Sequence, residues 1–345
     1  MRDRPPQHRA HWAARNYLVL ALQVAVTVAI LAVLFREPAR RAQMAEALRR
    51  ADWRWLVAGL LAYGAVEILG ALQWQLLLRI QGLRLGWLKA AAIFFIGVFF
   101  TTWTPGLIAG DAAQVFYVIK EAPQRKADAV LVVVMDRILG MFALVVLAAA
   151  VAVVRFHWLR QTALTARLVD ITAALLVAGL LGLLSAAAAA KSRALRRLAF
   201  ALRLTDSLRE IRDALRCYRA HWRRTVVAFA LTLAAHLLYF ATFYCAGRAL
   251  AGGVMTRAPS LAEMFSIMPI VNTLTALPIS LAGIGVRESL FQVLLHDLCG
   301  VPEALGVLIG ALGFAIRLFW GLPGAAAFFC YRREPRQTSA AGTFR

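Results

Sequence analysis

Six long apolar runs constrain this chain more than any other feature of its sequence. They cover residues 17–35, 55–78, 127–154, 168–190, 225–250 and 303–330. Each is close to or above the roughly 20 residues that an α-helix needs to cross a bilayer. A transmembrane β-barrel is excluded, because its strands are about 10 residues long and alternate apolar with polar side chains. Hydrophobic residues make up 61% of the chain and charged residues 17%, which also excludes a soluble globular enzyme, a disordered protein and a collagen-like fibre.

Two further apolar segments are too short to cross a bilayer and are interrupted by proline and glycine. The first runs over 88–103, breaks at Pro105 and Gly110, and resumes over 112–119. The second runs over 261–277, breaks at Pro278, Gly283 and Gly285, and resumes over 286–295. Non-helical backbone at membrane depth is tolerated only where it is buried in protein or lines a polar cavity. The sequence therefore predicts two re-entrant helical hairpins, at 88–119 and 261–298.

The two breaks resemble each other, and their surroundings repeat in the same order. Both carry the pattern Pro-x-x-x-Ala-Gly, at 105–110 and at 278–283. Each is followed by an acid near the start of a short helix, and then by a span that contains an arginine. The order span, span, hairpin, span occurs twice, with the hairpins entering from opposite sides. This is an inverted repeat, common among secondary transporters. We expect an all-α polytopic membrane protein with about six full spans, two re-entrant hairpins, and breaks that meet near the midplane.

The predicted organisation follows from these segments, and the basic residues orient it. It consists of a cytoplasmic N-terminal tail (1–16), a first repeat (17–154), a connector with the span that opens the second repeat (155–190), a basic interfacial helix segment (191–224), the remainder of the second repeat (225–330) and a cytoplasmic tail (331–345). With the N-terminus inside, cytoplasmic segments hold 25 of the 39 lysines and arginines and external segments hold 11. The positive-inside rule then predicts a multi-pass protein of the cell inner (plasma) membrane with both termini cytoplasmic. The six arginines of 36–54 are the exception, and the side of that segment stays open.

Ionisable residues inside the apolar segments are the candidates for function. Each charge at a span centre costs about 2.5–3.5 kcal/mol on the insertion scale, so each should face the protein interior with a partner. The set is Glu67, Asp111, Asp136, Arg137, His236, Arg287, Glu288 and Arg317. Glu67 and His236 taken singly fit an interhelical polar contact better than a functional role. Asp111, Arg287 and Glu288 favour function, because they lie at the breaks, where half-helix N-termini attract anions.

The repeat also suggests how these charges pair. Symmetry predicts Asp111 with Arg137 and Glu288 with Arg317, which leaves Arg287 free to bind a lipid headgroup phosphate. The alternative pairs Arg287 with Asp111 across the two hairpins and makes Arg287 structural. In the first scheme the acids hold the arginines in place or exchange protons to couple transport. The predicted substrate-binding residues are Arg287, Gly110, Gly283, Asp111, Glu288, Arg137 and Arg317, and the hairpin breaks are Pro105, Pro278 and Gly285.

No sequence pattern points to catalysis by this chain. A Walker loop, a dinucleotide-binding glycine pattern, paired histidine ligands and a nucleophile motif are all missing. We therefore expect no catalytic residue, no cofactor and no metal. The net charge of +21 does not imply nucleic acid, because the basic residues lie mostly in loops, where they set topology and meet anionic lipid headgroups. The four cysteines are far apart and match no metal-binding or redox spacing.

Three stretches together resemble a known family. The segment 105–111, the span with adjacent Asp136 and Arg137, and the segment 277–288 resemble the flippase-like membrane domain of bacterial lysylphosphatidylglycerol synthases, which also occurs alone. The resemblance covers roughly residues 15–332. The family pattern has Gly-Gly-Asp with an arginine three residues later, whereas Ala109 and Gln114 occupy those positions here; Ala282 also replaces a usual glycine. The missing arginine leaves the headgroup open.

The resemblance implies movement of a lipid between leaflets. The lipid would be an aminoacylated phospholipid, a glycolipid, or a polyprenyl- or hopanoid-type lipid. The family's soluble aminoacyl-transfer domain does not follow the last span, so aminoacylation is not expected of this chain, and a separate lipid-modifying enzyme is an expected partner. The alternative function is a membrane-embedded enzyme or accessory subunit of a lipid glycosyl- or phosphotransferase pathway. Oligomeric state is not determined by the sequence.

Overall fold

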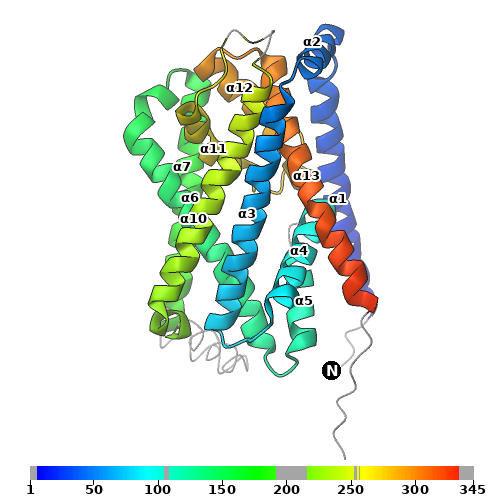
Figure 1. Cartoon of the computed structure of the whole chain (residues 1–345), viewed down its shortest axis with the longest axis vertical. Helices are drawn as coiled ribbons and strands as arrows, with labels where there is room; N and C mark the ends of the chain where they lie inside the picture. Colours follow the sequence, from blue (N-terminus) through cyan, green and yellow to red (C-terminus); the bar gives the residue numbers. More distant parts are fainter. Residues whose placement is uncertain (1–5, 105–108, 192–215, 252–254, 256, 334–345) are drawn as a thin grey trace, which may run out of the picture.

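The computed structural model describes residues 6–104, 109–191, 216–251, 255 and 257–333. Regular structure within these ranges is helical, without a strand (Figure 1). The helices are α1 (Pro6–Leu34), α2 (Pro38–Arg49), α3 (Trp53–Ile80), α4 (Trp87–Trp103), α5 (Ala109–Glu121), α6 (Lys126–Leu159), α7 (Ala163–Lys191), α10 (Trp222–Ala249), α11 (Leu261–Thr275), the 3-10 turn η1 (Leu281–Gly283), α12 (Val286–Cys299) and α13 (Glu303–Arg333). The predicted all-α polytopic membrane fold is confirmed.

Five helices in the described ranges are long and apolar enough to cross a membrane, namely α3, α6, α7, α10 and α13. The count rises to six if α1 and α2, which are bent by 85° relative to each other, form one broken span. Helix α3 shows why the pattern suits lipid. Its Asp52 N-cap accepts a hydrogen bond from the Arg54 N–H at 2.9 Å, and apolar residues then continue on every face. Trp74 and Leu77 are buried in the bundle while Leu61 is exposed, as expected for a helix whose outer face meets lipid.

The two broken segments form half-helices that enter the bundle from opposite ends (Figure 1). Helices α4 and α5 have 17 and 13 residues, and α11 and α12 have 15 and 14. At 1.5 Å per residue none reaches the about 30 Å of a hydrocarbon core. The α4–α5 pair lies at the lower end of Figure 1, near the start of α6, and the α11–α12 pair lies at the upper end. This is the arrangement that the predicted inverted repeat requires.

Helix packing repeats between the two halves. Helix α3 of the first half packs against α10 of the second along the centre of the bundle. Around this pair, α4 packs on α13 as α11 packs on α6, and α5 packs on α6 as α12 packs on α13. The opening helices break the symmetry, because α7 packs on α11 and α12 of its own half whereas α1 contacts η1 and α12 of the other half. The inner elements therefore follow the repeat, and the outer helices do not.

Several predicted boundaries need correction. Helix α1 begins at Pro6, so most of the segment predicted as a tail (1–16) is helical; proline suits a first helical turn, and no glycine or proline follows it there. Helix α6 continues to Leu159, five residues past the predicted end at 154, with a non-helical residue at Arg155. Helix α10 begins at Trp222 rather than at 225. Most of the basic segment 191–224 and of the tail 331–345 lies outside the described residues.

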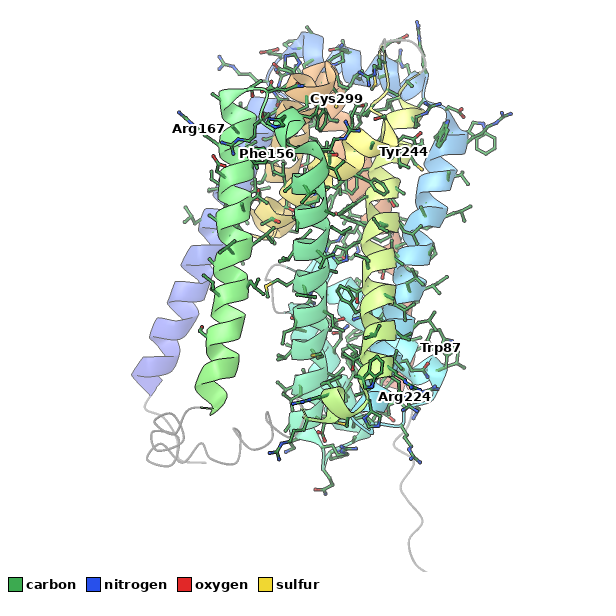
Figure 2. All side chains as sticks on the ribbon, turned by 90° about the vertical axis from the view of Figure 1, so that its left-hand side faces the viewer. Trp87, Phe156, Arg167, Arg224, Tyr244 and Cys299 are labelled. Atoms are coloured by element: carbon green, nitrogen blue, oxygen red, sulfur yellow. The ribbon has the colours of Figure 1, made fainter. Side chains whose placement is uncertain are left out.

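The two ends of the bundle carry the aromatic and basic residues typical of membrane interfaces. Figure 2 places Trp87 and Arg224 at the lower end, and Phe156, Arg167 and Tyr244 toward the upper end. Helix α1 begins and α13 ends at the same end of the bundle (Figure 1). This agrees with the prediction that the two termini share one side of the membrane, while the cytoplasmic assignment of that side stays a prediction.

Candidate functional site

The first hairpin contains an ion pair between its inner half-helix and the following span. Asp111 lies in the first turn of α5, and its carboxylate accepts hydrogen bonds from both Nε (3.1 Å) and Nη2 of Arg137 in α6. The predicted Asp111–Arg137 pair is therefore formed. Gly110 is buried where α5 meets α4, and a side chain there would collide with Thr101 and with the Gly97 carbonyl. The absence of a side chain at Gly110 permits this close approach of α5 to α4. Pro105 lies outside the described residues.

The second hairpin turns through unusual backbone conformations. Gly283 and Gly285 have φ values of +75° and +84°, which glycine adopts without strain, and Ala282 has φ 51°. The Glu288 carboxylate then accepts a hydrogen bond from the Gly285 N–H at 2.6 Å. The predicted Glu288–Arg317 pair is therefore wrong. The reason is position: an acid at the third residue of a helix reaches back to the N-cap N–H, so Glu288 stabilises the start of α12.

Arg287 is the least satisfied charged residue of the second hairpin. Its side chain is 2% exposed and lies over the Phe314 ring of α13, with 4.7 Å between the guanidinium carbon and the ring centroid. Its Nη2 donates to the Ala282 carbonyl at 3.3 Å, whereas Nε and Nη1 have no partner. Asp111 is paired with Arg137, so the alternative pairing is not formed. Within the described ranges Arg287 has no acidic partner, as predicted.

A second group of buried polar side chains lies where α3, α10 and α13 pack together. Glu67 of α3 is 5% exposed, as is Tyr63 one turn earlier on the same helix. Tyr63 meets Tyr239 of α10 edge to face, with the ring centroids 5.9 Å apart. Arg317 lies on α13, which packs against both of these helices. Glu67 lies outside the repeated motif, and its sequence signal, an acid in mid-span, favours an interhelical polar contact over a functional role.

The formal charges of these groups balance, but the hydrogen bonds of Arg287 are incomplete. Arg287 and Arg317 bring two positive charges, and Glu67 and Glu288, when ionised, bring two negative charges, because a hydrogen bond from a backbone N–H leaves the Glu288 carboxylate charged. The Nε and Nη1 donors of Arg287 are buried without a partner in the described residues. Buried charge is poorly stabilised without a partner. An arrangement of this kind is suited to receive an anion.

Two other intramembrane ionisable residues have local partners. The Asp136 carboxylate accepts a hydrogen bond from the Gln73 amide of α3 at 3.0 Å. His236 hydrogen-bonds through Nδ1 to the Thr232 carbonyl at 2.9 Å, within α10. Both contacts fit structural roles. No group of three metal-ligating side chains occurs in the part of the chain that the structure describes.

Helix α1 holds the tip of the second hairpin. Its Gln23 amide donates to the Pro278 carbonyl at 3.2 Å, and its Thr27 hydroxyl accepts from the Leu281 N–H at 2.9 Å. Ile30 lies close against Gly285. The break at Pro278 is thus fixed by polar contacts to a helix of the other half of the molecule.

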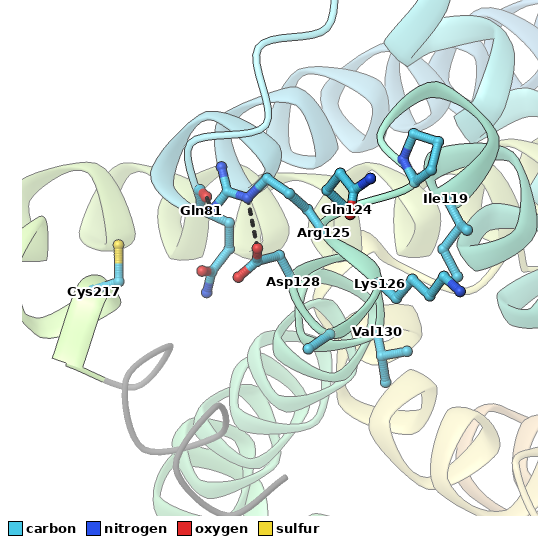
Figure 3. A pocket seen from close by; sticks show the side chains of 10 residues that line it. Gln81, Ile119, Gln124, Arg125, Lys126, Asp128, Val130 and Cys217 are labelled. Carbon is cyan, nitrogen blue, oxygen red and sulfur yellow. Dashed lines mark hydrogen bonds and ion pairs between the residues drawn. The ribbon is translucent and has the colours of Figure 1, made fainter. Parts of the chain in front are cut away.

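A pocket of about 850 Å³ lies away from these clusters, around the loop between α5 and α6 (Figure 3). Arg125 on its wall is satisfied by Asp128 (2.7 Å) and by the Gln81 carbonyl (2.7 Å). Burial raises the pKa of Cys217, which also lines the pocket, so its thiol stays neutral at physiological pH. None of the predicted site residues lines this pocket, and Arg125 and Asp128 on its wall pair with each other, so we do not place the site here.

Comparison with known proteins identifies the family. Residues 20–324 match the family described as the lysylphosphatidylglycerol synthase TM region. The match covers most of the chain, and the protein belongs to this family, as the motifs at the two breaks indicated. A search of the curated proteins found no match. The chain is therefore a multi-pass membrane protein from a lipid-related family.

Proposed function

We propose that this protein moves an anionic lipid between the leaflets of the bacterial inner membrane, with the lipid phosphate bound by Arg287 beside Arg317. The observation that supports this is the buried guanidinium of Arg287, whose Nε and Nη1 have no partner in the described residues. A phosphate diester offers acceptor oxygens to these two donors and a negative charge beside the Arg287 guanidinium. Charge-assisted hydrogen bonds of this kind contribute about 1.5–3 kcal/mol each.

The surrounding backbone favours the same ligand. The N-terminus of α12 begins two residues before Glu288, within the membrane-embedded hairpin, and its positive end favours an anion. The Gly285 N–H already donates to Glu288, so in this proposal the backbone N–H groups near Gly283 are the ones that donate to the phosphate. The backbone N–H groups near Gly110 have the corresponding position on the first hairpin. Asp111 and Arg137, which pair with each other, position the first hairpin in this proposal and do not contact the phosphate.

The inverted halves supply a route for transport. Half-helices that enter from opposite ends allow one half to move against the other, so that a midplane site opens to each side in turn. Lipid acyl chains can stay in the bilayer along the exposed apolar faces while the headgroup crosses the polar interior. Cytoplasmic termini and a separate enzyme that modifies the lipid belong to the same proposal.

Translocation by purified protein tests the proposal. Protein is reconstituted into phosphatidylcholine vesicles with fluorescently labelled phosphatidylglycerol, and a membrane-impermeant quencher reports the label that moves outward. Arg287→Met, which keeps an apolar stem over Phe314, should lose at least tenfold in rate while its thermal stability is retained or raised. The matched control is Arg160→Met: Arg160 also lies over an aromatic ring, Phe156 at 5.2 Å, but has the acidic partner Asp170.

Two outcomes would contradict the proposal. One is a wild-type rate in a folded Arg287→Met protein. The other concerns the phosphate itself: labelled glucosylceramide, which has none, should move no faster than in protein-free vesicles. Equal movement of both lipids would show scrambling without recognition of phosphate.

A further inference from the structure

Each re-entrant hairpin is tied at its outer end to the other half of the molecule by a hydrogen bond between a hydroxyl and a carboxylate. In the first hairpin, Glu121 at the end of α5 accepts a hydrogen bond from the Tyr331 hydroxyl near the end of α13. In the second, Asp297 near the end of α12 accepts one at 2.9 Å from the hydroxyl of Thr162, which lies in the turn directly after α6. We call these two contacts the Glu121 latch and the Asp297 latch.

The two latches have equivalent positions in the inverted repeat. Helices α5 and α12 are the second half-helices of the two hairpins, and α6 and α13 are the long helices that follow them. Each hairpin packs on the long helix of the other half, because α4 packs on α13 and α11 packs on α6. The ends of α5 and α13 lie at the lower end of the bundle in Figure 1. Phe156 and Cys299, which flank the Asp297 latch in sequence, lie toward the upper end in Figure 2.

The latches join the parts that must separate when a site between the halves opens. Alternating access opens one end at a time, by movement of one half against the other. With both latches formed, the turn of the second hairpin is closed to solvent: Arg287 is 2% exposed and Ser280 is 4% exposed. The Glu121 side chain is 19% exposed, so water can replace the Tyr331 hydroxyl when the latch breaks. Exchange of one hydrogen bond for another keeps the net cost of opening modest.

The two latches differ in strength. Glu121 also accepts a hydrogen bond from the Lys89 ammonium of α4 at 2.9 Å, and the Lys120 ammonium lies 4.9 Å from the centroid of the Tyr331 ring. Among the described residues no lysine or arginine forms an ion pair with Asp297. The Glu121 latch therefore holds three helices with charged contacts, whereas the Asp297 latch depends on the Thr162 hydroxyl.

We propose that the two latches are the gates of alternating access. The Glu121 latch closes the end that carries the termini, the Asp297 latch closes the opposite end, and the Asp297 latch is the weaker of the two. This inference rests on the proposed function, because gates of this kind serve a transporter. It follows that the protein without lipid opens more often toward the side opposite the termini.

A single cysteine reports which end is open. The four native cysteines are replaced by alanine, and Ser280→Cys places a thiol in the turn of the second hairpin, where the serine hydroxyl has no hydrogen bond to lose in the described residues. A membrane-impermeant maleimide is added from one side at a time, to spheroplasts and to inverted membrane vesicles. Tyr331→Phe should raise the labelling rate at least fivefold from the side of the termini alone. Asp297→Ala should do so from the opposite side alone.

Matched controls remove the same groups where they join no halves. Tyr244→Phe removes a tyrosine hydroxyl that has no hydrogen bond in the described part of the chain, while its ring contacts Trp55. Asp170→Ala removes a carboxylate whose partner, Arg160, lies ten residues earlier. Both should label within twofold of the parent protein. If a latch variant does not fold, Glu121→Ala or Thr162→Val cuts the same contact from its other side.

The outcomes separate the gates from the substrate. Folded latch variants that label as the parent does, or that both gain access from the same side, overturn the proposal. Faster labelling of the parent from the side of the termini overturns the order of strength. Side-specific labelling in a protein that moves no phosphatidylglycerol supports the gates and overturns only the proposed function.

Discussion

The two hairpins have matching sequence patterns and opposite electrostatic states. In the first, the acid at the start of the inner half-helix pairs with the arginine of the next span, and the charges cancel. In the second, the acid caps its own helix and the arginine beside it stays buried without an acidic partner. Repetition therefore reproduces the backbone break but not the chemistry, and the second hairpin has the stronger claim to the ligand.

The difference comes from where the charges stand relative to the break. Asp111 follows Gly110 directly and faces α6, whereas Glu288 lies three residues after Gly285, at the capping position. Close to its break, the first hairpin also has no cation of its own, because Lys89 and Lys120 lie at the far ends of α4 and α5. Gln114 occupies the position where the family pattern has arginine, and it is buried against Gly97 of α4. Because the Gln114 amide is neutral, Arg137 is the cation that pairs with Asp111.

Giving Arg287 an acidic partner, as Arg137 has in Asp111, should remove the electrostatic difference between the two hairpins. Phe314→Glu places a carboxylate next to Arg287, whose guanidinium lies 4.7 Å from the ring centroid. An internal ion pair would then occupy the donors proposed for phosphate, and we expect a loss of tenfold or more in phosphatidylglycerol translocation. Phe314→Leu, which removes only the ring, should cost less than threefold. Equal rates in the two variants would contradict the assignment of Arg287.

Glycine-to-alanine changes compare the backbone of the two breaks. Gly110→Ala forces a methyl group against Thr101 and the Gly97 carbonyl, and overpacking of this kind costs about 1–3 kcal/mol. Gly283→Ala has tight contacts with Thr275 (3.1 Å) and with Arg287 (3.3 Å), at a φ of +75°. We expect Gly110→Ala to lower the unfolding temperature more, and Gly283→Ala to lower translocation more. The reverse order would show that the ligand site belongs to the first hairpin.

Glu288 variants separate capping from proton exchange. Glutamine can still accept the Gly285 N–H, so Glu288→Gln should keep more than half of the wild-type translocation rate. Glu288→Ala removes the cap, which costs about 1 kcal/mol, and loosens the turn that carries Arg287. Thermal unfolding and translocation should both fall for alanine alone. Loss of transport in the folded glutamine variant would mean that Glu288 exchanges protons after all.

The ion pair of the first hairpin should have the smallest effect. The Arg137 side chain is 57% exposed and that of Asp111 is 21% exposed, so this pair lies at the edge of the bundle and not in the buried interior that holds Arg287. Asp111→Asn and Arg137→Met should each lower translocation less than threefold, with a double variant no worse than the single ones. A tenfold loss in either variant would give the first hairpin a direct role in binding.

Helix lengths and breaks could be predicted from the sequence because lipid imposes simple rules. Apolar runs of about 20 residues, and shorter ones cut by proline and glycine, indicate spans and hairpins. Helix boundaries in the polar segments could not be predicted as well, because helix and loop have nearly the same free energy in water. The start of α1 at Pro6, within the segment predicted as a tail, is the main example.

The charge pattern could be predicted only in part. Asp111 with Arg137 followed from symmetry, whereas Glu288 obeyed a local capping rule that its position should have suggested. Glu67 joined the site through helix packing, because α3 lies against α10 and α13. Packing between helices far apart in sequence has no signature in a single chain, so this part of the site required the structure.

The contacts of α1 have a consequence for assembly of the protein in the cell. Gln23 and Thr27 bind residues that lie 255 and 254 positions later in the chain. During synthesis α1 enters the bilayer before its docking site exists, and its backbone hydrogen bonds must be satisfied within the helix alone. Its final position is set only after the second hairpin has been made. A mutation that disrupts the Pro278 turn therefore leaves the first helix inserted but undocked. This partly assembled protein is the form that membrane quality-control proteases would degrade.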